Sequence, residues 1–318
     1  MNEIDIIEQW IVERNPMLMD MLLRDRTTGG RLKWATTNYK SKGENYFPNQ
    51  EITVTSISAA YTDVIQPRVT KTDDEKLKRT KDNAEVFTPS WVCNQQNNLV
   101  DNVWFGKENV FNTETPDGWI TNDEKIEFPK GKTWKDYIIA NRMEISCGEA
   151  PYLVSRYDTV TGREIQVKDR IGLLDRKMRI INENVDNKRE WFKWVKKAYK
   201  SIYGFDYQGD NVVLARENLL YTIIDNRKYK FDDEPTDKQL LEIAEILSWN
   251  IWQMDGLTYT TPFSEERKPE QIFLIYSDDE GHSSEVKMRP KDTLIYDWEA
   301  KRKMRFKELI RGYYNGYK

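Results

Sequence analysis

A helical rhythm of apolar positions opens the chain. Over residues 3–24 apolar side chains recur at helical spacing, and the Asn15-Pro16 pair predicts a break between two short helices. Residues 71–82 are rich in charge and follow no apolar pattern. A solvated helix is the expectation for this second segment, with a phosphate contact as the alternative.

A segment in which apolar and polar residues alternate lies between these two predicted helical segments. Apolar and polar residues alternate over residues 51–57, which predicts a half-buried strand. The Gly29-Gly30 pair predicts a turn, and we expect another strand directly after it. Together these patterns predict a helical and β extension over residues 1–83.

Strand and helix patterns alternate in the remainder of the chain. A helix is expected from Trp91 to about Val103, because Thr88-Pro89-Ser90 is a helix-start signal. Residues 170–200 predict a long amphipathic helix, interrupted near residues 184–187. Further strands are expected at residues 201–207 and 270–279, and further helices at residues 209–226 and from residue 236. This alternation favours an α/β domain over residues 84–318 with a largely parallel sheet.

Composition narrows the class of protein. The 318 residues can bury one good core, and 12% aromatic with 32% charged residues is typical of a soluble globular chain. The net charge of -4 does not indicate a strongly basic DNA-binding surface on the chain as a whole. A local basic patch is still compatible with nearly equal numbers of acidic and basic residues. No apolar run is long enough to span a bilayer, and the first ten residues are acidic rather than signal-like. A cytoplasmic protein without a membrane partner is the expectation.

The sequence has few residues that could bind a metal ion or act as a catalytic nucleophile. Cys93 and Cys147 are far apart, and His282 is the single histidine, so no zinc site or other metal site is expected. His282 lies in a polar stretch, where a solvated loop histidine is favoured over a catalytic one.

Four short segments carry candidate ligand chemistry. Gly148 follows an apolar strand pattern, where a glycine lets backbone approach a ligand. Asp206 ends the next strand, where a carboxylate can accept from a ribose diol, although a helix-capping role competes with this interpretation. Asp255 follows a third apolar segment, and Thr88-Pro89 opens a helix that could cover the same pocket.

These segments, in this order, resemble the adenine-specific DNA methyltransferases of restriction–modification systems. The matching stretches are "EVFTP", "EISCG", "GFDYQGDNVVLARENL" and "NIWQMDGL", within residues 85–257. The resemblance implies a Rossmann-like class I methyltransferase fold that binds S-adenosylmethionine. It also implies cofactor roles for Phe87, Thr88, Pro89, Glu144, Ser146, Cys147, Gly148, Asp206, Tyr207 and Asp255.

The chain departs from that family in three ways. Ala150 stands where the family loop usually has a second glycine. The long interval before Asp206 implies an insertion over about residues 159–200, beside another over about residues 106–133. The Asn/Asp-Pro-Pro-Tyr/Phe motif that aligns the target amine and stacks the flipped base is missing. Pro262 and Phe263 are the nearest candidates for its place.

A basic, tryptophan-rich segment offers a separate nucleic-acid hypothesis. Its candidate contacts are Lys193, Lys196, Lys197 and Lys200. Trp191 and Trp194 lie between them, and inward packing of these rings is favoured over base stacking. A plain DNA-binding protein built on this helix is one hypothesis.

Two further hypotheses follow from the resemblance. The chain is expected to be the modification subunit of a restriction–modification system, incomplete by itself. It would then bind DNA, and its catalytic and base-recognition parts would come from a partner chain, such as a second methyltransferase or specificity subunit, or from an unusual local substitute. The alternative is a non-catalytic protein of the same fold that serves as a regulatory or interaction subunit.

Overall fold

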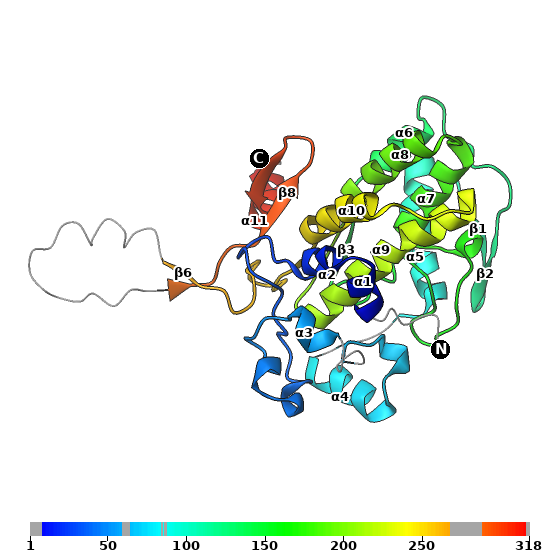
Figure 1. The fold of residues 1–318 in the computed structure, drawn as a ribbon. Helices are drawn as coiled ribbons and strands as arrows, with labels where there is room; N and C mark the ends of the chain where they lie inside the picture. The colour runs from blue at the N-terminus through cyan, green and yellow to red at the C-terminus, as the bar shows by residue number, and fades with distance from the viewer. Residues whose placement is uncertain (1–7, 59–63, 84, 86–87, 268–287, 316–318) are drawn as a thin grey trace, which may run out of the picture.

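The computed structural model describes residues 8–58, 64–83, 85, 88–267 and 288–315. The described helices are α1 (Glu8–Arg14), α2 (Pro16–Leu23), α3 (Val54–Ile57), α4 (Asp73–Asn83), α5 (Ser90–Phe105), α6 (Trp134–Ile139), α7 (Leu173–Asn184), α8 (Lys188–Lys200), α9 (Gly209–Phe231), α10 (Asp237–Asn250) and α11 (Phe306–Asn315). The described strands are β1 (Asn112–Thr115), β2 (Gly118–Thr121), β3 (Arg142–Ile145), β4 (Ile202–Asp206), β5 (Ile251–Gln253), β6 (Glu266–Arg267), β7 (Met288–Arg289), β8 (Leu294–Asp297) and β9 (Arg302–Arg305) (Figure 1).

Most predicted helices are confirmed. The expected break falls between α1 and α2, where the Asn15 side chain accepts a hydrogen bond from the N–H of Met17 and Pro16 begins the second helix. The charge-rich segment forms α4, and the interrupted amphipathic segment forms α7 and α8. The strand predicted over residues 270–279 lies outside the described residues, as does His282.

The two strands predicted in the N-terminal extension are wrong. Residues 54–57 form the short helix α3, because Thr53 and Ser56 make a reciprocal capping box that favours a helical turn. After Gly30 the chain makes isolated bridges, such as Lys33 to Glu51, and no continuous strand. The alternating pattern arises here from local packing and not from a ladder of hydrogen bonds.

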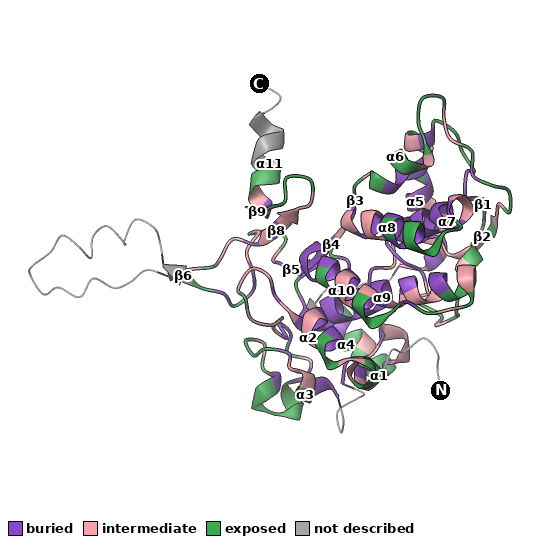
Figure 2. Cartoon of the chain, turned by 45° about the horizontal axis from the view of Figure 1, so that its top comes forward, coloured by how far each residue is buried: buried purple, intermediate pink, exposed green. Residues whose placement is uncertain are grey.

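The N-terminal extension shares the main hydrophobic core with the rest of the chain. Leu22 and Trp34 are fully buried in the same cluster as the inward residues of α7, α9 and α10. Figure 2 shows buried stretches, in purple, on α9 and α10. The buried guanidinium of Arg216 in α9 donates to the backbone oxygens of Leu22 (2.5 Å), Arg24 (3.0 Å) and Ile251 (2.8 Å). The extension is therefore held against the sheet by apolar packing and by buried hydrogen bonds.

The expected parallel sheet is present, with the strand order β3-β4-β5. Helices α7 and α8 connect β3 to β4, and α9 and α10 connect β4 to β5. The carboxyl ends of the three strands consequently meet at one edge of the sheet. Assignment of this sheet to a Rossmann-like methyltransferase fold stays a prediction.

The two faces of the sheet are covered unequally. Ile202 and Ile251 point into the main core, whereas Phe205 and Trp252 join a smaller cluster with Phe306 of α11. On the face that carries this smaller cluster, the apolar side chains of the neighbouring strand β3 are exposed to solvent. Met143 is 45% exposed and Ile145 is 67% exposed. The far edge of β3 pairs with no strand in the described part of the chain.

Short hairpins complete the structure. The insertion predicted over residues 106–133 contains the antiparallel hairpin β1–β2, and β8–β9 forms another beside α11 (Figure 1). Within the described ranges, every helix is too short or too polar to cross a membrane.

Candidate functional site

The loop after β3 has an unusual backbone. Ser146, Gly148 and Ala150 all have left-handed φ angles, of +51°, +51° and +64°. Glycine adopts this conformation without penalty, whereas other residues do so at a cost. A Cβ at Gly148 would meet nothing within 4 Å, so the backbone angle alone favours glycine there. Ala150 occupies a left-handed position at the place where the methyltransferases that the sequence resembles usually have a second glycine.

Asp206 ties this loop to the end of β4. Its Oδ2 accepts from the N–H of Gly148 at 3.0 Å, and its Oδ1 accepts from the N–H of Gln208 at 2.9 Å and from Asn211 Nδ2 at 3.4 Å. Burial raises the pKa of this carboxyl to about 6, although the three donors act in the opposite direction. A carboxylate has about four acceptor directions, so capacity for one further donor remains.

Glu144 lies on β3 with its carboxylate turned to the backbone that follows the loop. It accepts from the N–H groups of Tyr152 (3.4 Å) and Leu153 (3.2 Å). Burial raises the pKa of Glu144 well above its usual range. Its part in holding this backbone is a structural role that the sequence did not indicate.

These residues line one pocket of about 500 Å³, here termed the Asp206 pocket. It gathers most of the predicted cofactor residues, namely Thr88, Glu144, Ser146, Cys147, Gly148, Asp206 and Tyr207. Cys147 is buried, and burial raises the pKa of its thiol, which fits the packing role expected of a small side chain. Phe87 lies outside the described residues, and Pro89 directly precedes α5 without lining the pocket.

The segment that contains Thr88 is held in place by residues about 70 positions later in the sequence. The Thr159 hydroxyl donates to the Thr88 carbonyl at 3.0 Å, and the Asp158 carboxylate accepts from the N–H of Ser90 at 2.7 Å. A carboxylate at the first turn of a helix satisfies a free N–H and favours the helix dipole. The start of α5 is therefore positioned against the pocket by the chain just after the loop.

The pocket has an acidic lining that sequence reasoning found only in part. Glu85 and Glu149 join Glu144 and Asp206 in its wall, and none of the described residues that line it is a lysine or an arginine. Glu85 is paired with Arg79 behind the pocket, at 2.8 Å. Burial raises the pKa of Glu149, while nearby Lys71 and the hydroxyl of Tyr157 counteract this effect. Such a lining suits a cationic ligand better than an anionic one.

Asp255 lies in a neighbouring pocket of about 530 Å³, here termed the Phe263 pocket. Its Oδ1 accepts from the N–H groups of Leu257 (2.8 Å) and Thr258 (3.1 Å), which makes it the cap of a turn. Pro262 and Phe263 line the same pocket, and Tyr207 lines both pockets. Asp255 and the Gly148 loop therefore line two different pockets that share Tyr207.

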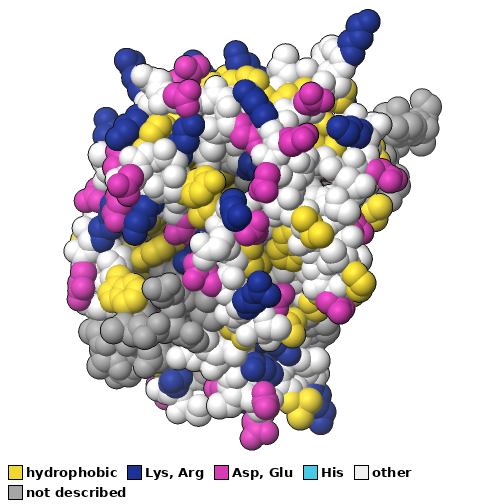
Figure 3. All heavy atoms as spheres, turned by 90° about the vertical axis from the view of Figure 1, so that its right-hand side faces the viewer, with side chains coloured by type: hydrophobic (Ala, Val, Ile, Leu, Met, Phe, Trp, Pro, Cys, Tyr) yellow, Lys and Arg dark blue, Asp and Glu magenta, His cyan; other side chains and the backbone are white. Residues whose placement is uncertain are grey.

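The lysines of α8 lie away from both pockets. This helix ends just before β4 begins, so Lys200 lies near the amino end of the sheet, opposite the carboxyl edge. Trp191 and Trp194 are buried, as inward packing requires. Lys196 pairs with Glu242 at 2.7 Å, and Lys197 Nζ lies 4.0 Å from the Trp194 ring centroid. On the face shown in Figure 3, acidic and basic side chains are interspersed.

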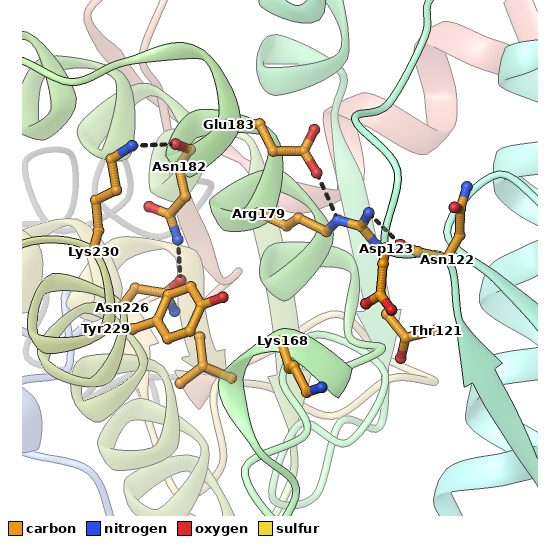
Figure 4. A pocket seen from close by; sticks show the side chains of 11 residues that line it. Thr121, Asn122, Asp123, Lys168, Arg179, Asn182, Glu183, Asn226, Tyr229 and Lys230 are labelled. Carbon is orange, nitrogen blue, oxygen red and sulfur yellow. Dashed lines mark hydrogen bonds and ion pairs between the residues drawn. The ribbon is translucent and has the colours of Figure 1, made fainter.

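A third hollow of about 430 Å³ lies between α7, α9 and the end of β2 (Figure 4). Its polar side chains bond to one another. Asn182 donates to Asn226 at 2.9 Å, Arg179 donates to Glu183 at 2.8 Å, and Lys230 donates to the Asn182 carbonyl at 2.7 Å. The bonds from Asn182 to Asn226 and from Lys230 to Asn182 join α7 to α9 and satisfy part of the polar lining of the hollow.

No protein-family model, no curated protein and no solved structure matches this chain. In the described part of the chain no cluster of three or more His, Cys, Asp or Glu side chains is arranged to hold a metal ion.

Proposed function

We propose that this chain binds S-adenosylmethionine in the Asp206 pocket and is the modification subunit of a DNA adenine methyltransferase. The observation that carries the proposal is the hydrogen bond from Gly148 to Asp206. It joins a left-handed loop after one parallel strand to a buried carboxylate that ends the next strand. Ligands of α/β proteins bind at such carboxyl edges.

The lining of the pocket fits the chemistry of this cofactor. Asp206 retains one acceptor direction for a ribose hydroxyl, and Tyr207 offers a half-exposed ring beside it. Asp206 is largely ionised above about pH 6, and its charge favours a ligand that carries sulfonium and ammonium charges. When bound, the cofactor supplies an electrophilic methyl group. The protein's own residues would hold it at the mouth of the loop and exclude water.

The chain is proposed to be incomplete as an enzyme. The segment at Pro262 and Phe263 presents a proline and an aromatic ring, but threonines stand where the amide acceptor belongs. The Thr261 hydroxyl is buried against that of Thr293, at 3.2 Å. This burial favours the second candidate function, a non-catalytic methyltransferase-fold subunit that regulates or binds DNA or another subunit.

Calorimetry with S-adenosylmethionine tests the binding step. Wild-type protein should bind, and Asp206→Ala should weaken binding by roughly tenfold or more, because a charged hydrogen-bond acceptor is lost. Asp117→Ala is the matched control, since Asp117 is exposed on the β1–β2 turn. Absence of binding by the wild-type chain would refute the proposal.

Methyl transfer separates the two candidate functions. Radiolabelled cofactor and DNA, with and without a purified partner subunit, would report transfer to adenine. Transfer that requires a partner supports an incomplete modification subunit. Cofactor binding without transfer under either condition supports the non-catalytic alternative.

A further inference from the structure

The strand β3 lies at a free edge of the parallel sheet. It pairs with β4 on one side, and in the described part of the chain no strand pairs with its other side. The N–H of Arg142 donates to the Ser201 carbonyl at 2.9 Å, so Arg142 and Glu144 turn their backbone groups toward β4. The N–H and C=O groups of Met143 and Ile145 therefore point outward, and they bond to no described residue.

One face of this edge is apolar and uncovered. Met143 is 45% exposed and Ile145 is 67% exposed, and both side chains lie on the same face as Phe205 of β4. Phe205 is buried there against Phe306 of α11, with ring centroids 5.9 Å apart. The cover that α11 provides therefore stops before β3. Because parallel sheets are normally covered on both faces, a sheet that ends in this way lacks a neighbour.

The other face of the edge borders an apolar hollow of about 460 Å³. Arg142, whose side chain lies on the face of β3 opposite to Met143, lines this hollow with four residues of α5, namely Leu99, Val100, Val103 and Trp104. Val103 is 86% exposed. The Arg142 guanidinium is paired with Asp101 at 3.6 Å, so its charge is balanced within the fold. The hollow is therefore suited to apolar side chains, and exposed apolar patches of this kind mark protein interaction sites.

We infer that the free edge of β3 binds an extended strand of a partner chain, and that this strand is apolar on both of its faces. Its backbone pairs with the outward groups of Met143 and Ile145. Its side chains pack on Met143 and Ile145 on one face and fill the hollow beside Val103 on the other. A helix would leave the edge unpaired, because its own N–H and C=O groups are bonded internally. The inference goes beyond the proposed function, since it holds whichever ligand the Asp206 pocket binds.

A second copy of the chain fits this edge less well. In a closed two-fold pair the two β3 strands run antiparallel, and both copies turn the same face to the same side. The copy would then place Arg142 and Glu144, which share one face of β3, beside the apolar hollow. Glu144 is also buried and already bonded to the backbone of Leu153. The occupant is therefore a strand with a different pattern from β3 itself.

Three labelled peptides test this inference by anisotropy titration. The first, Lys-Lys-Val-Ile-Val-Leu-Val-Lys-Lys, is apolar on both faces of a strand. The second has threonine in place of Ile and Leu, so one face is polar, and the third has proline in place of the central Val, so it lacks a strand donor. All three carry the same charge. Wild-type protein should bind the first peptide at least roughly tenfold more tightly than either of the others.

Amide hydrogen exchange shows whether the peptide pairs with the backbone of β3. In the protein alone, the amides of Met143 and Ile145 should exchange rapidly because they face solvent. Saturating amounts of the first peptide should slow their exchange roughly tenfold or more. The amides of Arg142 and Glu144 are the internal control, since they already bond to β4 and should change little.

Matched variants locate the peptide on both faces of the edge. Met143→Lys and Val103→Lys should each weaken binding of the first peptide roughly fivefold or more, because burial of an exposed apolar side chain is lost. Met17→Lys is the control, since Met17 is 64% exposed on α2, outside this surface, and this variant should bind as wild type does. Equal effects of Met17→Lys and Met143→Lys would overturn the assignment, as would failure of the wild-type protein to prefer the first peptide.

Two further measurements separate the remaining outcomes. Sedimentation velocity of the protein alone should show a monomer, whereas self-association that Met143→Lys abolishes would assign the edge to a second copy and overturn the inference. Calorimetry with S-adenosylmethionine should give the same affinity for Met143→Lys as for wild type, because Met143 does not line the Asp206 pocket. A chain that binds S-adenosylmethionine but not the first peptide refutes the strand site alone. The reverse result refutes only the proposed function.

Discussion

The N–H of Gly148 donates to Asp206 Oδ2 at 3.0 Å, which links two residues that are far apart in the sequence. Both lie just at the carboxyl ends of β3 and β4, which are parallel and adjacent. The bond closes the loop onto the sheet and orients the carboxylate that we assign to the ribose. If the proposed ligand binds there, stability and ligand binding would be coupled at this contact.

The titration of Asp206 should appear in the pH dependence of stability. Burial raises its pKa from 3.8 to about 6, so the folded protein binds the proton more tightly than the unfolded chain. The free energy of unfolding should then fall by about 3 kcal/mol as pH rises from about 4 to 7 through this group. Asp206→Asn lacks the titration, so its stability relative to wild type should rise over the same interval in urea denaturation. Parallel pH profiles for the two proteins would contradict this.

Gly148 should be required because its backbone angle is left-handed, and not because a side chain would lack room there. Gly148→Ala places a side chain at a φ of +51° without any contact within 4 Å. The expected loss is about 1–2 kcal/mol in the free energy of unfolding. Gly118→Ala, where φ is not left-handed and the nearest atom is at 3.4 Å, is the control and should change stability by less than about 0.5 kcal/mol. Equal effects in the two variants would show that strain at the loop is not the cause.

Gly209 should be required because there is no room for a side chain at this position. A Cβ at the start of α9 would lie 2.0 Å from the Lys33 carbonyl oxygen, and both backbones are fixed by neighbouring hydrogen bonds. Gly209→Ala is expected to cost about 1–3 kcal/mol. Because the clash pushes the N-terminal extension away, limited proteolysis should cut near residue 33 faster than in wild type. Unchanged cleavage together with lost stability would place the damage in α9 instead.

The elements were predicted more reliably than the contacts between them. Asn15-Pro16 and the apolar spacing fixed the break between α1 and α2, because caps and periodicity act over a few residues. The same local logic failed for residues 51–57, where alternation predicted a strand but the Thr53 capping box made a helix. Two local signals conflicted there, and the hydrogen bonds of the cap prevailed.

The residues of the candidate site likewise divide into those whose meeting could be predicted from the sequence and those whose meeting could not. Gly148 and Asp206 could be predicted to meet, because each follows a strand of a parallel sheet. Asp255 lies two residues beyond β5, far enough to place it in the next pocket. Asn49 lies in the extension and Glu85 just after it, and both reach the pockets through long-range packing that no local pattern marks.

Arg79 should be essential for attaching α4 to the rest of the protein. Its buried guanidinium pairs with Glu85 and Asp210 at 2.8 Å each, and Tyr39 donates to Asp210 at 2.7 Å. Burial alone would raise the pKa of Asp210, but Arg79 reverses this and lowers it. Arg79→Met leaves the buried Asp210 without its ion pair and Glu85 with only the longer pair to Arg68, at 3.6 Å, and should cost about 3–5 kcal/mol in urea denaturation.

A surface arginine provides the comparison for Arg79. Arg14 pairs with Glu234 at 2.9 Å and with Asp237 at 3.2 Å, but these groups are exposed to solvent. Arg14→Met should therefore cost less than about 1 kcal/mol. If Arg79→Met is tolerated as well as Arg14→Met, the buried network does not hold α4 in place.

The lysines of α8 should contribute little to binding of nucleic acid at the proposed site. They lie near the amino end of the sheet, Lys196 is neutralised by Glu242, and Lys197 rests on the Trp194 ring. Replacing Lys193, Lys197 and Lys200 with glutamine should change oligonucleotide affinity less than about twofold at moderate salt. The slope of log affinity against log salt should also stay constant. A slope that falls by about two or more would mean that these lysines contact phosphates, which would favour a DNA-binding surface on α8 over one at the carboxyl edge.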